Sequence, residues 1–427
     1  MGIIFTFVLA EIGILLGDLD AIAPILTMFF LATYGFTNLA CGLERWAASP
    51  SFRPDFRVPW WISLAGAISC FYVMSMINMQ AMFGAFAICG LIFVVAERRA
   101  LGTTYGDARH GIWSALVRSA LYRLRRATFH PQNWRPNLLI LGGSPEKRPH
   151  LLELGSAIVQ ERGIVSYFHL LKGPVLDLAE ERRELLETKD SEVAERFPHV
   201  FYRVDIVDDI YPGVVSVAQS YGIGSFQANT VMLGWLSKDD RAEGYLKMLR
   251  DLVRLDRSIL LVRHKEKTND TGKSERSKKK EIHIWWGGLQ GNGGLMLLIA
   301  FLLSNGHEWH GTTINIMTAV DDALAKREAE EALQKIIAAA RVSATPCVIL
   351  KQGRSISDIM YAESADADLA IMGIPMPPES ISAENFFKHI NQMLDKLPTT
   401  IMIHSARNFS GEPVLFDESK SQDSISV

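Results

Sequence analysis

The first 97 residues form four long apolar runs with few charges, and this feature constrains the fold more than any other. A transmembrane helix needs about 20 apolar residues to cross a hydrocarbon core about 30 Å thick. A soluble core helix of that length would carry a polar face, which these runs lack. We therefore predict a membrane segment at 1–97, with transmembrane helices at 3–16, 21–43, 60–77 and 81–96.

The arginines predict how this segment is oriented. Basic loops next to transmembrane helices stay in the cytoplasm. Arginines follow the second and fourth runs, whereas the opposite loops carry Asp18, Asp20 or no charge; the arginines are Arg45, Arg53, Arg57, Arg98 and Arg99. We therefore predict a multi-pass integral protein of the plasma (inner) membrane, with everything after residue 97 in the cytosol.

Glu11 interrupts the first apolar run. An ionisable residue at membrane depth is by default a functional candidate. The alternative is a carboxylate that packs against helices outside this chain. The sequence leaves both readings open and favours the second.

Charge and cysteine content exclude several classes of protein. The formal net charge is −3, so the strongly basic character of a nucleic-acid binder is missing. The four cysteines form no C-x-x-C pair, which argues against a disulfide framework and a zinc site. We predict no metal site and no nucleic-acid partner.

Residues 98–136 are predicted to connect the membrane segment to a soluble part. Within them, 113–126 has apolar residues at helical spacing and four arginines between them. A basic amphipathic helix beside a membrane can lie on anionic lipid. It can equally be a rigid connector packed on a partner, which is the interpretation we favour here.

The rest of the chain repeats one pattern twice. Each of two lobes, 137–264 and 281–406, has five apolar strand-like runs separated by helical stretches. The runs are 138–141, 164–170, 200–207, 230–233 and 258–262 in the first lobe, and 282–286, 312–317, 346–350, 369–372 and 400–404 in the second. Such alternation predicts a doubly wound parallel sheet in each lobe. Helices are predicted at 146–161, 239–254, 293–304, 322–341 and 383–395.

Two polar stretches flank the second lobe. Residues 265–280 carry seven lysines or arginines and few apolar residues, so they cannot bury a core. We predict a charged linker there, with a polybasic lipid contact as the alternative. The tail at 407–427 is also polar, and we predict disorder.

Several segments resemble the cation-chloride cotransporters of the amino acid–polyamine–organocation permease superfamily, in the order in which that family has them. Those in the membrane segment are Leu19–Leu31, Asn38–Cys41, Ser49–Arg57 and Trp61–Gly66. Those in the soluble part are Asn133–Leu141, Ile282–Trp286, Gly293–Leu298 and Asp366–Leu369. The resemblance spans residues from about 5 to 405.

The resemblance implies an electroneutral symporter of Cl⁻ with K⁺, Na⁺ or both. Such transporters have twelve helices with inverted repeats, and their ion sites lie on the first, third, sixth and eighth helices. The runs here would be the ninth to twelfth helices, so no ion-binding residue is expected in this chain, which would be a C-terminal portion. The resemblance also implies a homodimer and a regulatory cytosolic domain of paired universal-stress-protein folds. The alternative is a membrane-tethered nucleotide sensor or scaffold that does not transport.

A glycine-rich turn after a strand can hold phosphate at a helix N-terminus. Such turns begin at Gly142 and at Gly287, but neither follows a dinucleotide or P-loop pattern. We therefore predict no obligatory cofactor. If a regulatory nucleotide such as ATP binds, we expect it at the first turn, with Gly142, Gly143 and Ser144 as backbone donors.

The remaining polar residues predict no catalytic site and no enzyme. His283, His307 and His310 lack metal-ligand neighbours in sequence, so a structural role is expected. Trp285 and Trp286 sit in a buried-strand pattern. The Asp321-Asp322 pair is expected to cap the helix that follows.

Overall fold

The computed structural model describes residues 19–406 with gaps at 49–51, 53–55, 57, 99–107, 129, 131–132, 161, 225, 237–240, 266–278 and 288, together with 3, 4, 7, 8, 11, 409 and 415. The chain divides into two units, 1–127 and 128–427. The first predicted transmembrane run and the linker at 265–280 lie mostly outside the described residues. Glu11 is described, and it is helical and exposed.

The first unit contains four long helices among its described residues: α2 (Leu19–Ala47), α3 (Trp60–Ile77), α4 (Met79–Arg98) and α5 (Ala108–Arg126). Two of the described helices are long and apolar enough to cross a membrane, at Leu26–Ala47 and Trp60–Ile77. The apolar part of α4, Met79–Val95, is shorter than that criterion requires. The second and third predicted spans are therefore helices long enough to cross a membrane. The fourth predicted span is a helix, but its apolar part is too short to meet the same criterion.

Small residues let α2 and α3 approach closely. A methyl group on Gly42 would lie 2.8 Å from Leu64 Cδ2. Ser63 Oγ lies 3.8 Å from Cys41 Sγ across the same contact. Small residues with polar side chains between helices are typical of packing in membranes. Asn78 separates α3 from α4, and its Oδ1 accepts a hydrogen bond from Ala81 N at 3.0 Å.

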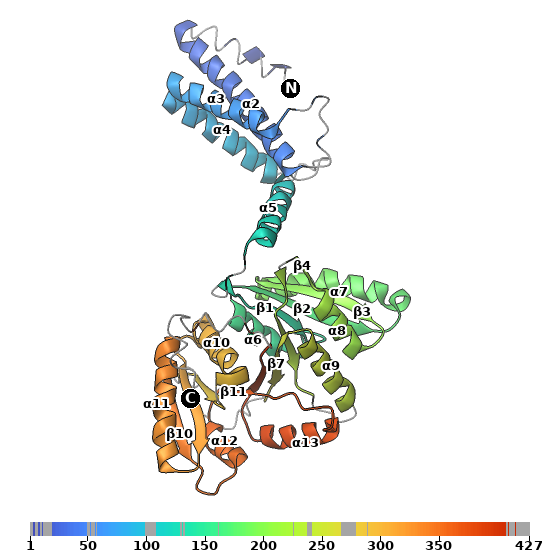
Figure 1. Ribbon diagram of the computed structural model, residues 1–427. Helices are drawn as coiled ribbons and strands as arrows, with labels where there is room; N and C mark the ends of the chain where they lie inside the picture. The colour runs from blue at the N-terminus through green and yellow to red at the C-terminus, as the bar shows by residue number, and fades with distance from the viewer. Residues whose placement is uncertain are drawn as a thin grey trace, which may run out of the picture. The chain divides into compact units, whose positions relative to one another are not determined.

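The second unit has a ten-stranded sheet in the order β10-β9-β8-β11-β12-β7-β6-β1-β2-β3 (Figure 1). The first half of the unit contributes β1 (Asn137–Leu141), β2 (Ile164–Lys172), β3 (Val200–Val207), β6 (Thr230–Gly234) and β7 (Ser258–Arg263). The second half contributes β8 (Glu281–Trp285), β9 (Thr313–Val320), β10 (Ala344–Leu350), β11 (Leu369–Gly373) and β12 (Thr400–His404).

The strands are parallel within each half, and the two halves join through antiparallel pairing of β7 with β12. All ten predicted strands are present. The expectation of a separate sheet in each lobe needs correction, because the outermost strands of the two halves pair and make one sheet. A short hairpin, β4 (Gly222–Ile223) with β5 (Phe226–Gln227), is additional to the predicted pattern.

Helices cover both faces of this sheet, and each core layer extends across both halves. One layer contains α6 (Pro149–Val159), α7 (Val175–Arg196), α10 (Gly294–Ser304) and α11 (Ala323–Ala340). The other contains α8 (Ile210–Ser220), α9 (Ala242–Arg254), α12 (Ile356–Ser364) and α13 (Ala383–Leu394). Burial on both faces explains why the strand sequences are continuously apolar rather than alternating.

The α10 helix shows the same burial most clearly. It is apolar on all sides, which is typical of a helix buried in a core or a membrane. Here it packs on α6 and on the sheet, and Leu295, Leu297 and Leu303 are fully buried. The predicted disordered tail also contributes two described residues to this layer, Phe409 and Leu415.

Side-chain hydrogen bonds join the two halves on both sides of the sheet. Trp235 Nε1 donates to Asn391 Oδ1 at 2.6 Å, and Arg263 Nη1 donates to the Leu397 carbonyl at 2.9 Å. Gln160 Nε2 donates to the Leu302 carbonyl at 2.8 Å. These bonds, the shared sheet and the shared core layers make the α/β unit one body rather than two linked lobes.

Candidate functional site

The repeat places two equivalent positions at carboxyl ends of strands, one in each half. In the first half, β1 lies in the sheet between β2 and β6 and is paired with both. The chain passes from β1 to β2 on one side and returns later to β6 on the other. In the second half, β8 has the same place between β9 and β11. Ligands of open parallel sheets bind where the strand order reverses in this way. The two glycine-rich turns singled out in the sequence lie at these two positions.

In the first half the turn carries Gly142, Gly143 and Ser144, followed by α6. Gly142 is buried, and a methyl group there would overlap the Tyr167 hydroxyl. Gly143 has a φ of 72°, in the left-handed region that glycine adopts without strain. The backbone and its neighbours therefore explain why glycine occupies both positions, without any need for a bound ligand.

Tyr167 lies under this turn without a hydrogen-bond partner. Its side chain is fully buried, and its hydroxyl has none among the described residues. Burial raises the pKa of Tyr167, because the phenolate would lose its hydration. Leaving a buried hydroxyl unsatisfied costs about 1–3 kcal/mol. This position was not apparent in the sequence, because Tyr167 lies on β2, far from the turn along the chain.

Arg148 covers the other side of the same position. A methyl group on Gly234, at the end of β6, would lie 2.8 Å from Arg148 Nη1. Arg148 is exposed, and its guanidinium makes no hydrogen bond or ion pair with the described residues. Tyr245 Oη donates to the Gly234 carbonyl at 2.9 Å below it. An anion arriving at this turn would therefore meet a free guanidinium and the N-terminal end of α6.

The second half has a different arrangement at the equivalent place. Asn292 takes the position of Arg148: a methyl group on Gly373 would lie 2.9 Å from Asn292 Nδ2. Asn292 Oδ1 accepts from Ser405 N at 2.8 Å, and Nδ2 lies 3.5 Å from the Ile374 carbonyl. The amide is therefore engaged within the protein, and this position is filled by its own side chain.

A buried polar network accounts for His283 and Trp285. Trp285 Nε1 donates to Ser364 Oγ at 3.0 Å, and His283 Nδ1 lies 3.0 Å from the same oxygen. Ser364 is fully buried, so it cannot act as a nucleophile toward an external substrate. Burial lowers the pKa of His283, which favours the neutral imidazole. These contacts agree with the structural role expected from the sequence.

The other singled-out residues lie apart from these positions. Asp322 Oδ1 accepts from Ala325 N at 2.8 Å, so the predicted helix cap at α11 is confirmed. His307 and His310 are exposed, on either side of Trp309. Within the described part of the chain, no group of three or more His, Cys, Asp or Glu residues could hold a metal ion.

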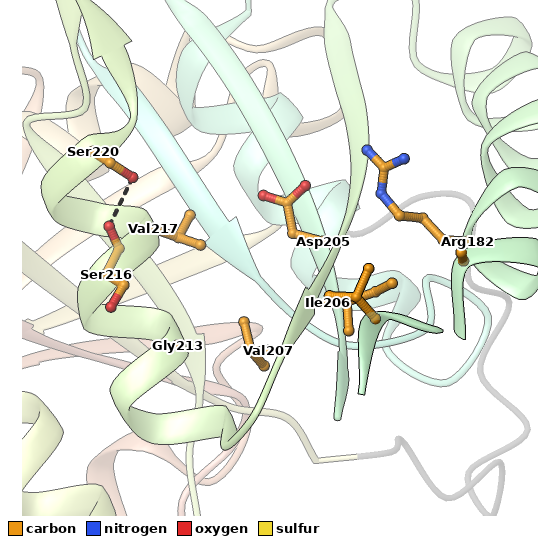
Figure 2. Close-up of a pocket in the computed structure, with 10 residues that line it drawn as sticks. Arg182, Asp205, Ile206, Val207, Gly213, Ser216, Val217 and Ser220 are labelled. Carbon is orange, nitrogen blue, oxygen red and sulfur yellow. Dashed lines mark hydrogen bonds between the residues drawn. The ribbon is translucent and has the colours of Figure 1, made fainter. Parts of the chain in front are cut away.

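A cavity of about 470 Å³ opens between α7, the end of β3 and α8 (Figure 2). Its walls are apolar, with Val175, Val207 and Val217, and its polar groups include Arg182 and Asp205. Arg182 Nε already donates to the Val204 carbonyl at 2.8 Å. Sequence reasoning missed this cavity because it predicted neither α7 nor α8. Among the described residues that line the cavity, no pair of groups is arranged for acid–base or nucleophilic chemistry.

The fold therefore defines a class of protein: a doubled α/β unit in the same chain as helices of membrane length. Residues 267–355 match the family model described as SLC12, solute carrier family 12. This is the family of cation-chloride cotransporters, so the resemblance predicted from the sequence is confirmed over that segment.

Two solved structures also resemble the chain. The cytoplasmic domain of a prokaryotic cation chloride cotransporter is 19% identical with a TM-score of 0.48, over 66% of this chain and 100% of that one. A universal stress protein from Archaeoglobus fulgidus is 10% identical with a TM-score of 0.43, over 65% of this chain and 99% of that one.

The two glycine turns generate a paired prediction. Gly142→Ala should lower the free energy of unfolding by about 1–3 kcal/mol, because the new methyl group collides with Tyr167 in a packed region. Gly287→Ala is the matched control, since a methyl group there meets nothing within 4 Å. Adding Tyr167→Phe to Gly142→Ala should restore part of the loss. Urea unfolding followed by tryptophan fluorescence measures all three, and equal effects of the two alanines would contradict the steric argument.

The His150 side chain generates a pH prediction. It stacks on His264 with ring centroids 4.4 Å apart, and burial together with the His264 and Arg148 charges lowers the pKa of His150 to about 4. As the pH falls, His150 is protonated in the unfolded chain, near pH ~6.5, before it is protonated in the folded chain. The free energy of unfolding therefore has its full value above pH ~6.5 and decreases between pH ~6.5 and ~4. His150→Gln should flatten that fall, whereas His389→Gln, at an exposed position of α13, should not. Unfolding midpoints from pH 7 to 4 test this, and an unchanged slope in His150→Gln would refute it.

Proposed function

We propose that this chain is the C-terminal portion of a cation-chloride cotransporter. The observation that carries the proposal is the solute carrier family 12 match at 267–355, in the same chain as two helices of membrane length. The order of the family-like segments, from Leu19–Leu31 to Asp366–Leu369, supports it. Arg45 in the last turn of α2 supports a cytosolic position for that helix end and for the soluble unit.

In this proposal the described helices and the α/β unit have different roles. The membrane helices belong to a multi-pass transporter of the plasma (inner) membrane that moves Cl⁻ with K⁺ or Na⁺, and the ion sites lie on helices outside this chain. The α/β unit regulates transport and contributes to a homodimer. Its continuous sheet and shared core layers support this role, because a single rigid body transmits a displacement between its ends.

Ion uptake tests the transport proposal. Cells expressing this chain fused behind the first eight helices of a family member should take up rubidium in a chloride-dependent way, and cells expressing the chain alone should not. Surface labelling must show equal membrane insertion of both proteins. If a well-inserted fusion takes up no rubidium, the proposal fails and the membrane-tethered sensor becomes the better reading.

A second candidate function is regulatory binding of a nucleotide at Gly142, Gly143 and Ser144. What supports it is the contrast between the halves: Arg148 is free to meet a phosphate, whereas Asn292 is engaged. No nucleotide-binding signature accompanies the turn, so the proposal rests on this geometry.

Thermal unfolding with ATP tests that candidate. A ligand that binds only the folded state stabilises it by about 2.7 kcal/mol at a hundredfold excess over Kd. ATP should therefore raise the unfolding temperature of the chain, and Arg148→Ala should abolish the rise. Arg327→Ala, at an exposed position on α11, is the control and should keep it. An unchanged unfolding temperature in saturating ATP would eliminate the candidate.

A further inference from the structure

Among the described residues, α5 contacts α2 through the side that carries Gly111, Ala115 and Arg118. A methyl group on Gly111 would lie 3.6 Å from the Ala47 side chain, and Ala115 is 1% exposed. Arg118 Nη2 donates to the Ala47 carbonyl at 3.3 Å. Ala47 is the last residue of α2, one of the two helices of membrane length. The contact therefore holds α5 at the level where α2 ends.

The opposite side of α5 carries an apolar stripe, consisting of Trp113, Leu116, Val117 and Leu124, that is exposed within the described part of the first unit. At about 3.6 residues per turn, Trp113, Val117 and Leu124 lie close together on the helix and roughly opposite Gly111 and Ala115. Their exposed fractions are 68%, 58% and 46%, and that of Leu116 is 42%. Large apolar side chains gathered on one exposed helix face are typical of a surface that binds a protein or a membrane.

The charges of α5 identify the kind of surface. The helix contains five arginines and no aspartate or glutamate. By the same helical spacing, Arg123 and Arg125 flank the stripe on its two sides, as in helices that bury an apolar face among anionic headgroups. A tryptophan in the stripe also fits the boundary between water and hydrocarbon.

We propose that α5 lies on the cytosolic leaflet, with the apolar stripe in the lipid and its arginines among anionic phospholipid headgroups. The contact with Ala47 holds α5 beside the end of a helix of membrane length, and the unbroken positive charge favours acidic lipid over a neutral one. This function is separate from transport: α5 couples the lipid composition of the leaflet to the start of the soluble unit. In this proposal the segment 98–136 still connects the two units, and its helix α5 in addition binds anionic phospholipid.

Probes on the two sides of α5 test the proposal in the full chain. With the four native cysteines replaced by alanine, Val117→Cys places an environment-sensitive fluorophore on the stripe. Tyr122→Cys is the matched control, since Tyr122 is 61% exposed and lies on the opposite side. Both proteins are reconstituted in phosphatidylcholine vesicles with and without phosphatidylglycerol, and brominated acyl chains serve as quenchers.

The expected result is a blue-shifted emission with loss of intensity at position 117 in the acidic vesicles and little change at 122. Changing Arg123, Arg125 and Arg126 to glutamine should remove the dependence on phosphatidylglycerol. Far-UV circular dichroism and gel filtration verify that each variant is folded. Absence of quenching at 117, or equal quenching at both positions, overturns the proposal. A disulfide between two copies at position 117 without quenching would overturn it in favour of a protein partner.

Discussion

The antiparallel pairing of β7 with β12 is the contact on which the α/β unit depends. It aligns Arg263 with Thr400 and Ile259 with His404, and it turns two five-stranded sets into one sheet. Once the strands are joined, α6 and α10 meet on one face and α9 and α13 on the other. A parallel sheet is normally covered by helices on both faces. Here helices of both halves pack side by side in each covering layer. The hydrogen bond from Trp235 to Asn391 adds a side-chain contact between the two halves.

Equivalent positions in the two halves differ in chemistry although their backbone pattern is the same. Gly234 and Gly373 end equivalent strands, and each lies under a side chain from the segment after the first strand of its half. In the first half that side chain is the cationic Arg148, and in the second it is Asn292, which is engaged within the protein. The doubled fold thus carries an exposed cationic side chain at one position and a hydrogen-bonded amide at the other.

The strands, the helix cap at Asp322 and the two membrane-length helices were predictable, because each depends on neighbours in the chain. Three helices were not predicted, each for a local reason. α7 is highly charged and only Val193 on it is buried, so its apolar periodicity is weak. α8 has Pro212 and Gly213 in its first turn, which resembles a loop signal. α12 is only 9 residues long.

The sequence by itself determined the membrane-length helices, the two repeated sets of five strands and the residues of the glycine turns, because hydrophobic period and turn chemistry are local properties. Only the tertiary structure decided that the halves share one sheet, that Tyr167 lies against Gly142, and that Asn292 fills the second position. It also decided which side of α5 packs on α2 and which side is exposed within the described part of the first unit. These outcomes depend on contacts between residues far apart along the chain, and no local pattern encodes them.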